Sequence, residues 1–227
     1  MADFILALPI LLFSVVAHEY AHAWTAYRQG DDTAFALGRL TLNPVPHIDP
    51  VWSVLFPLGL YWVTSLSGHP FTFGAARPVP VDPRKFRNYR RGDLIVSSAG
   101  IITNLLLAVG CAVLFAAAGL AGTAAPGLAG ALGTLQRMLV FGVLLNFTLA
   151  VFNLLPIPPL DGSHLFYHAL PASWGARYLR LARFGFVLVF AVFLVPGAWD
   201  VVLWPVDALS GATLSAVGRF ALPAVAR

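Results

Sequence analysis

Long apolar stretches separated by short polar connections run through most of the chain. A membrane-spanning helix needs about 20 mostly apolar residues. By this criterion we expect four full spans and two partial ones. The full spans cover residues 4–27, 94–120, 135–155 and 180–206. The pattern therefore predicts an all-α polytopic membrane protein with about five to six membrane segments.

The connection between the first two full spans is less regular. Residues 38–44 alternate like a strand, within a polar connection. Residues 51–67 are apolar but short, and Pro57 and Gly59 interrupt them, which is typical of a re-entrant hairpin or a thin span. Prolines and β-branched residues over 70–82 predict extended structure. We expect a short re-entrant or β-like element between the first span and the central helix.

The later part of the chain carries shorter features between its spans. Residues 121–133 are rich in Gly and Ala and predict a loop, and prolines after residue 155 end the preceding helix. A short helix is expected over 162–171. The Pro196-Gly197 pair predicts a kink in the last span, and 207–227 predicts a mildly amphipathic tail at the membrane interface.

Composition supports this interpretation. The chain has 227 residues, of which 59% are hydrophobic and 11% charged, and its mean hydropathy is +0.79. Soluble domains carry about 25% charged residues. Cys111 is the single cysteine, so neither an internal disulfide nor a cysteine metal site is predicted. No basic region precedes the first apolar segment, so a cleaved signal peptide is not expected.

Basic side chains gather in a short stretch ahead of the 94–120 span. They are Arg77, Arg84, Lys85, Arg87, Arg90 and Arg91. Such a run can contact nucleic acid, but in a chain this apolar it is expected to face the cytoplasm and anionic lipid headgroups. Membrane lipid is therefore a predicted partner, and nucleic acid is not.

An H-E-x-x-H sequence lies inside the first apolar segment, over residues 18–22. Ionisable groups at membrane depth are costly unless they are paired or bind a metal. His18 and His22 are one helical turn apart on the same face, which suits two imidazoles on one Zn²⁺ ion. Glu19 is then placed to act as a general base on water. The alternative interpretation is a chance occurrence of the pattern in a helix.

Asp161 is the candidate for the third ligand that a catalytic zinc site requires. It is another acidic residue between apolar residues, directly after the proline-broken helix. One metal bound to Asp161 and the two histidines satisfies two sites that are otherwise costly in a membrane. Alternatively, Asp161 is the N-cap of the following short helix.

Two motifs together resemble the site-2 protease family of intramembrane zinc metalloproteases. They are H-E-x-x-H over 18–22 and N-x-x-P-x-x-x-L-D-G over 153–162. A G-x-x-x-N stretch over 100–104 is also similar to the family, although Ile101 stands where many members have proline. The resemblance covers roughly residues 4–170 and points to compact members without an inserted PDZ domain.

The resemblance implies roles for individual residues. His18, His22 and Asp161 are expected to bind one zinc ion per chain, and Glu19 to activate water. Asn153 is expected either to donate to the developing oxyanion or to position the substrate backbone. A hydrogen bond at the end of its helix is the alternative role for Asn153.

The remaining polar residues have weaker signals. Asn104 is expected to hold helices together. His47 lies in a turn-rich segment and is expected to bond to the backbone, although a metal or gating role is open. His164 can orient a metal ligand through a hydrogen bond, or it can serve as an additional ligand. His69 and His168 are expected at the membrane interface.

The implied function is zinc-dependent endopeptidase activity on or near transmembrane segments of single-span membrane proteins. We expect one membrane-embedded peptidase domain over 1–227, with a catalytic core at about 4–170 and a C-terminal span and tail over 175–227. A bacterial inner membrane is expected, with the N-terminus outside and the active site near the cytoplasmic face. A helical substrate must unwind before attack, and the extended segment over 70–81 is expected to pair with it by strand addition.

Two other classes of protein fit parts of the pattern. A transporter or ion-binding protein accounts for intramembrane His, Glu and Asp, but not for their metalloprotease spacing. A catalytically inactive membrane scaffold does not need Glu19 beside the two histidines.

Overall fold

The computed structural model describes residues 2–55, 58–59, 62, 77–185, 187–189, 195, 197–223 and 225. Within this part of the chain every regular element is a helix, which confirms the all-α prediction. Four helices are long and apolar enough to cross a membrane. They are α1 (Ala2–Gln29), α4 (Tyr89–Ala124), α5 (Ala129–Leu154) and α9 (Ala198–Val217).

Shorter helices connect these four. The α-helical ones are α2 (Thr33–Ala36), α6 (Asp161–Ala169) and α7 (Ala172–Leu179). Single turns of 3₁₀-helix cover Val45–His47, Pro83–Lys85, Pro126–Leu128, Arg180–Phe184 and Gly218–Phe220, and Pro50–Leu55 is a π-helix.

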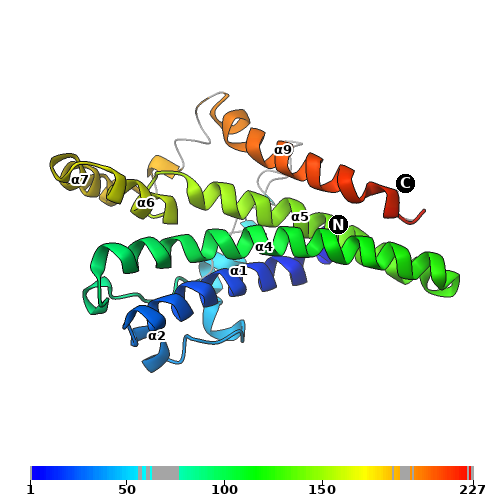
Figure 1. The fold of residues 1–227 in the computed structure, drawn as a ribbon, viewed down its shortest axis with the longest axis horizontal. Coiled ribbons are helices and arrows are strands. Elements are labelled where there is room, and N and C mark those ends of the chain that lie inside the picture. The colour runs from blue at the N-terminus through cyan, green and yellow to red at the C-terminus, as the bar shows by residue number, and fades with distance from the viewer. Residues whose placement is uncertain are drawn as a thin grey trace.

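The long helix α4 lies at the centre of the bundle, with α1 along one side, α5 along the other and α9 against α5 (Figure 1). The end of α1, the start of α4, the end of α5 and the short α6 all lie at the same end of the molecule (Figure 1). This arrangement brings the two sequence motifs, 18–22 and 153–162, to one end of the bundle. In the chain, 130 residues separate them.

Small residues allow the long helices to pack closely. Ala108 and Ala112 of α4 are buried against Val143 and Phe147 of α5, and Val206 of α9 completes this cluster. Close packing of small residues is a main source of helix association in lipid, where no hydrophobic effect drives it. The cluster therefore fixes the positions of α4 and α5 relative to each other.

The predicted loop over 121–133 is wrong for most of its length. Helix α4 continues to Ala124, and α5 begins at Ala129. Gly122 serves contact instead of chain reversal, because a Cβ there would collide with the side chain of Leu222. The same holds for Gly119 at the end of the predicted 94–120 span, where a Cβ would collide with the carbonyl oxygen of Phe220. Small residues that signalled a loop are in fact places where the C-terminal segment packs against α4.

The boundaries predicted for the last span and the tail are also wrong. Gly197 has a φ of +78° and is the N-cap of α9, so a helix begins inside the predicted 180–206 span; Pro196 lies outside the described residues. Residues expected in an interfacial tail belong to α9, and Leu222 beyond it is only 3% exposed. Its backbone N–H donates to Oε1 of the buried Gln136 on α5.

The strand expected over 38–44 is absent from the described structure, because local side chains form turns there. Gly38 has a φ of +65°. Thr41 Oγ1 accepts from the backbone N–H of Asn43, and Asn43 Oδ1 accepts from that of Val45. Such bonds compete with strand pairing. Of the 51–67 and 70–82 segments, most of the first and residues 70–76 lie outside the described residues.

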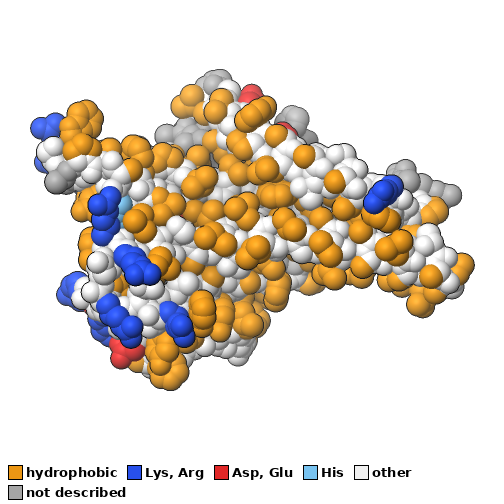
Figure 2. Space-filling model, viewed as in Figure 1, with side chains coloured by type: hydrophobic (Ala, Val, Ile, Leu, Met, Phe, Trp, Pro, Cys, Tyr) orange, Lys and Arg blue, Asp and Glu red, His pale blue; other side chains and the backbone are white. Residues whose placement is uncertain are grey.

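The surface separates charge from apolar area. Hydrophobic side chains cover the long sides of the bundle, while most Lys and Arg side chains in this view gather at the end that holds α2, the start of α4 and α7 (Figure 2). A long apolar surface with basic groups at one end is the pattern expected of a membrane-embedded bundle.

Candidate metal centre

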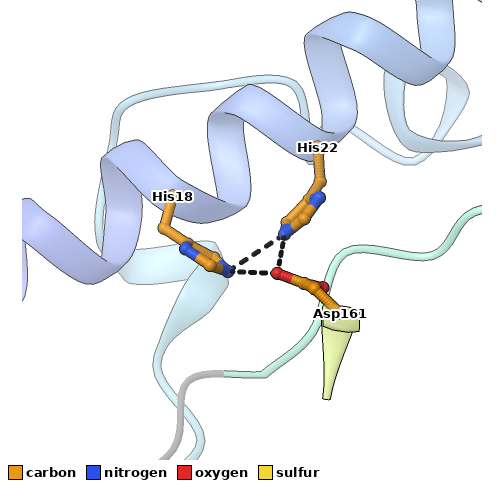
Figure 3. Close-up of side chains that lie close together, drawn as sticks. All are labelled: His18, His22 and Asp161. Atoms are coloured by element: carbon orange, nitrogen blue, oxygen red, sulfur yellow. Dashed lines mark hydrogen bonds and ion pairs between the residues drawn. The ribbon is translucent and has the colours of Figure 1, made fainter. Parts of the chain in front are cut away.

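Two histidines of α1 and one aspartate of α6 meet at one point (Figure 3). His18 and His22 are 8% and 9% exposed. Their Nε2 atoms are 3.0 Å apart, and Asp161 Oδ2 lies 3.3 Å from His18 Nε2 and 3.2 Å from His22 Nε2. Asp161 is the first residue of α6 and Leu160 is its N-cap, so the alternative that Asp161 itself caps the helix is wrong.

The other ring nitrogen of each histidine fixes its protonation. His22 Nδ1 lies 2.8 Å from the carbonyl oxygen of Val96. A carbonyl only accepts hydrogen bonds, so Nδ1 of His22 carries the hydrogen and Nε2 has a lone pair. His18 Nδ1 likewise donates to Asn104 Oδ1 over 2.6 Å. In the neutral rings, both Nε2 lone pairs therefore point toward Asp161.

This arrangement fits a zinc ion. Zinc bonds of about 2.0–2.1 Å in a tetrahedron place neighbouring ligand atoms about 3.3 Å apart. The three measured separations of 3.0, 3.2 and 3.3 Å are close to that value. Asp161 Oδ2 is buried without a hydrogen-bond donor, although two nitrogens lie nearby. Three lone-pair donors that converge without a proton between them are satisfied by a cation.

A chain of amides crosses three helices behind His18. Asn146 of α5 donates to the carbonyl oxygen of Gly142, which sets the orientation of its amide group. Asn104 of α4 can then donate to Asn146 Oδ1 over 2.9 Å and accept from His18. Asn146 also donates to Ser14 Oγ of α1. Because Asn104 and Asn146 are both fully buried, this chain is shielded from exchange with water and holds the His18 ring in place.

Gly100 gives the two histidines their space. A Cβ at this position would lie 2.5 Å from His22 Nε2 and 2.6 Å from His18 Nε2. No real Cβ approaches a nitrogen so closely, so only glycine lets α4 pass behind the imidazole rings. The G-x-x-x-N stretch thus contributes an empty space at Gly100 and a hydrogen-bond acceptor at Asn104.

The Glu19 carboxylate is held by a backbone amide. Glu19 Oε2 accepts the N–H of Val79 over 2.8 Å. Pro78 and Pro80 flank Val79 and have no N–H, so Val79 supplies the one backbone donor of this tripeptide. The half-buried Glu19 side chain is therefore oriented by the segment that follows the basic residue Arg77.

A buried arginine supports that segment. Arg39 is 9% exposed, and its Nη2 donates to the carbonyl oxygen of Arg77 over 2.7 Å and more weakly to that of Pro78 over 3.4 Å. The backbone N–H of Arg77 donates in turn to the carbonyl oxygen of His47. These bonds fix the backbone immediately before Val79. Of the segment predicted to be extended, residues 77–82 form neither a helix nor a strand, and Asp82 has extended backbone angles. Side chains and loops hold this segment in place of a neighbouring strand.

Other residues singled out from the sequence have structural partners. Asn153 Nδ2 donates to the carbonyl oxygen of Leu149, a helix-end bond. His47 is 1% exposed and bonds to the carbonyl oxygen of Thr41, as predicted for a loop histidine. His164 and His168 both contact Asp93, and the side chain of His168 is only 6% exposed, so it packs against protein. His69 lies outside the described residues.

Sequence reasoning missed four residues that support the centre: Ser14, Arg39, Val79 and Asn146. A signal existed for Asn146, because an amide in the middle of a 26-residue apolar helix needs a partner. The other three had no such signal. Val79 acts through its backbone N–H, and the Arg39 guanidinium bonds to backbone carbonyls, so neither has a side-chain partner that a sequence pattern could indicate.

Comparisons with known proteins agree with the geometry. Residues 118–195 match the model of "Peptidase family M50". The chain is 38% identical over 199 residues to "Putative zinc metalloprotease YwhC" of Bacillus subtilis, covering 86% of this chain and 82% of that protein. It is 31% identical over 208 residues to "Putative zinc metalloprotease Rip2" of Mycolicibacterium smegmatis, covering 90% and 74%.

A Rip2 protein of Mycobacterium tuberculosis is 35% identical over 223 residues, which cover 95% of this chain and 78% of that protein. No solved structure matches the chain. An apolar helical bundle that brings two buried histidines and a half-buried aspartate together fits a membrane-embedded metallopeptidase. The chain belongs to peptidase family M50, the site-2 protease family, whose compact members it resembles.

Proposed function

We propose that this intramembrane zinc endopeptidase binds one zinc ion through His18 Nε2, His22 Nε2 and Asp161 Oδ2. The observation that carries the proposal is the convergence of these three atoms, 3.0 to 3.3 Å apart, with no hydrogen bond to Asp161 Oδ2. Family membership establishes the zinc metalloprotease activity and a membrane-protein substrate in a lipid environment. It also disfavours a transporter that uses the same residues as an ion site.

Glu19 is the proposed general base. When bound, zinc lowers the pKa of water and polarises a carbonyl group. The Glu19 carboxylate accepts a proton from the attacking water and returns it to the leaving amine nitrogen. Oε2 is held by the Val79 N–H, so Oε1 is the oxygen that we assign to proton transfer. The bond at Oε2 fixes the orientation of the Glu19 carboxylate, while Oε1 stays free to accept the proton.

Asn153 is the proposed group that polarises the substrate carbonyl or positions the substrate backbone. One hydrogen of its amide is given to the carbonyl oxygen of Leu149. An amide nitrogen has two hydrogens, so a second one remains for a substrate. Replacement of Asn153 by Asp would keep the size of the side chain and remove both donors. We expect this variant to lower kcat and leave zinc content unchanged.

The proposed substrate is a single-span membrane protein whose helix unwinds before cleavage. Strand addition along 70–81 is the proposed way of holding the unwound segment. The described part of this segment sets one constraint: Val79 gives its N–H to Glu19, and the prolines beside it cannot donate. Pairing must therefore use carbonyl oxygens here. Proline scanning over 71–76 should reduce cleavage; unchanged cleavage at every position would rule out strand addition.

The proposed location is a bacterial inner membrane, with the centre near the cytoplasmic face and the N-terminus outside. Support comes from the basic side chains, which gather at the end of the bundle where α4 begins and α6 lies (Figures 1 and 2). Residues 51–67 would re-enter from that face, giving five to six membrane segments. A reporter fused after residue 67 should remain cytoplasmic; its appearance outside would refute this topology.

We further propose that residues 1–227 form one peptidase domain, with the catalytic core at about 4–170 and a C-terminal span and tail over 175–227. Cleavage of a panel of single-span membrane peptides in detergent by the purified chain tests the function. Cuts within or beside the spanning segment are expected, and chelation should abolish them. Cuts that persist in the Glu19→Gln variant would assign the activity to a contaminant.

A further inference from the structure

A second cluster of ionisable groups lies between α4 and α6. Asp93 of α4 is 4% exposed. His168 Nε2 lies 2.7 Å from Asp93 Oδ2, and His164 Nδ1 lies 3.2 Å from Asp93 Oδ1. The two histidines are four residues apart on α6, so they share one face of that helix. None of the three residues belongs to the metal centre.

Other contacts strengthen the same junction. The Arg90 guanidinium donates to the backbone carbonyl of His168 over 3.2 Å. The rings of Tyr89 and Tyr167 lie 5.6 Å and 5.0 Å from the His168 ring. A buried carboxylate is costly unless charged or hydrogen-bonding partners compensate it. Asp93 has such partners on α6, so removing them leaves a buried charge without compensation.

The pairing itself excludes a second metal site of the usual kind. His168 Nε2 is close enough to Asp93 to share a hydrogen with it, and a nitrogen that carries a hydrogen has no lone pair for a metal. The hydrogen bond to Asp93 raises the pKa of His164 above its ordinary value, against the opposing effect of burial. The cluster is therefore a set of hydrogen-bonded side chains that joins two helices.

The junction bears on the metal centre because of where Asp161 stands. Helix α6 has only nine residues, and Asp161 is the first of them. Irregular backbone from Leu155 to Leu160 precedes it. His18 and His22 are oriented by residues of α4, the helix that also carries Asp93. These residues are Asn104 and Val96. Contacts of α6 with α4 thus fix the position of Asp161 relative to the same helix that orients His18 and His22.

We propose that Asp93, His164 and His168 form a clamp that positions Asp161 against His18 and His22. This inference rests on the proposed role of Asp161 as a ligand. The three residues are positioning residues, since they contact one another and not the metal-binding atoms. Zinc affinity, and not only cleavage, should depend on them.

Paired substitutions separate the hydrogen bonds of the clamp from simple packing. His164→Ala and His168→Ala remove the donors. His168→Gln places an amide nitrogen near the former Nε2, and His164→Asn places one near the former Nδ1, so each restores a donor. Phe166→Ala on the exposed side of the same helix is the matched control. Zinc affinity is measured by chelator competition, and ligand geometry by the visible spectrum of the Co²⁺-substituted protein.

We expect the alanine variants to bind zinc about 10–100-fold more weakly, as is typical when groups that orient ligands are lost. Their Co²⁺ spectra should change, while helix content stays that of the wild type. The Gln and Asn variants should recover most of the affinity, and Phe166→Ala should match the wild type. Unchanged affinity in both alanine variants, or more than one bound zinc per wild-type chain, would overturn the clamp.

The experiment also distinguishes failure of the clamp from failure of the proposed zinc site. If the wild type binds no zinc, the proposed metal centre fails, and the clamp fails with it. If the wild type binds zinc and Asp161→Ala abolishes binding while the clamp variants bind normally, the metal centre stands and the clamp alone fails. If one alanine variant does not fold, the other carries the test, and wild-type zinc affinity in that variant would overturn the clamp.

Discussion

His18 donates its Nδ1 hydrogen to Oδ1 of Asn104, 86 residues further along the chain, over 2.6 Å. This bond decides which nitrogen of His18 faces the candidate metal centre, because the lone pair is left on Nε2. The Asn104 amide nitrogen donates to Asn146, so the amide oxygen is the atom that faces His18, and an oxygen of this kind can only accept. The orientation of a candidate ligand on α1 is thus set by the amides of two other helices.

Asn104→Ala should weaken zinc binding without unfolding the bundle. The substitution leaves His18 free to rotate and to change tautomer, and loss of such a partner typically costs 10–100-fold in metal affinity. Chelator competition on the purified protein measures the effect. Thr148→Ala on α5 is the control, since Thr148 Oγ1 donates to the carbonyl oxygen of Leu144 within the same helix. Equal affinity of the Asn104→Ala variant and the wild type would contradict this role.

Gly100→Ala should abolish zinc binding, because the added methyl group occupies the space of both imidazole rings. Gly110→Ala is the matched control in the same helix, where a Cβ meets nothing within 4 Å. Alanine favours a helix over glycine by up to about 1 kcal/mol, so the control should keep its zinc and be slightly more stable. Zinc content and thermal unfolding of the two variants give the comparison. Zinc retained by Gly100→Ala would contradict the site.

Val79→Pro should lower cleavage and leave zinc content at the wild-type level. Proline removes the N–H that binds Glu19 Oε2, so the carboxylate loses its orientation while the metal ligands are untouched. Val79→Ala keeps the N–H and should cleave at close to the wild-type rate. Rates and zinc content are measured on the same preparations. Equal rates for the proline and alanine variants would show that this bond does not matter.

Gln136→Leu should destabilise the bundle and release the C-terminal segment. Gln136 donates to the carbonyl oxygens of Phe115 and Phe220 and accepts from the N–H of Leu222. A buried polar group that loses its partner costs about 1–3 kcal/mol, and several are affected here. Denaturation in detergent and proteolysis of the C-terminus report the two effects. Zinc affinity should change little, because this residue lies far along α5 from Asn146.

The metal centre was predictable from the sequence for a physical reason. Ionisable residues within apolar segments need partners, and His18, His22 and Asp161 can satisfy one another through one cation. The support around them was not predictable in the same way. Asn146 carried a visible signal, but its partner could not be named, because helix register in a bundle depends on packing of small residues such as Ala108.

The errors in the fold have a shared cause. Gly122 was taken for a loop residue, yet it makes room for a later segment of the chain. Asp93 directly follows the basic stretch in the sequence, although it is buried and its partner His164 is 71 residues away. Local patterns identify helices well, but they do not distinguish a glycine that bends the chain from one that admits a neighbour.

The most direct test of the account is the zinc content of the purified wild type, Glu19→Gln and Asp161→Ala proteins, with cleavage assayed on the same samples. The account predicts about one zinc and cleavage for the wild type, in line with a single catalytic centre. Glu19→Gln should keep its zinc and not cleave, and Asp161→Ala should lose both. A full complement of zinc in Asp161→Ala, or none in the wild type, would contradict the assignment of the metal centre.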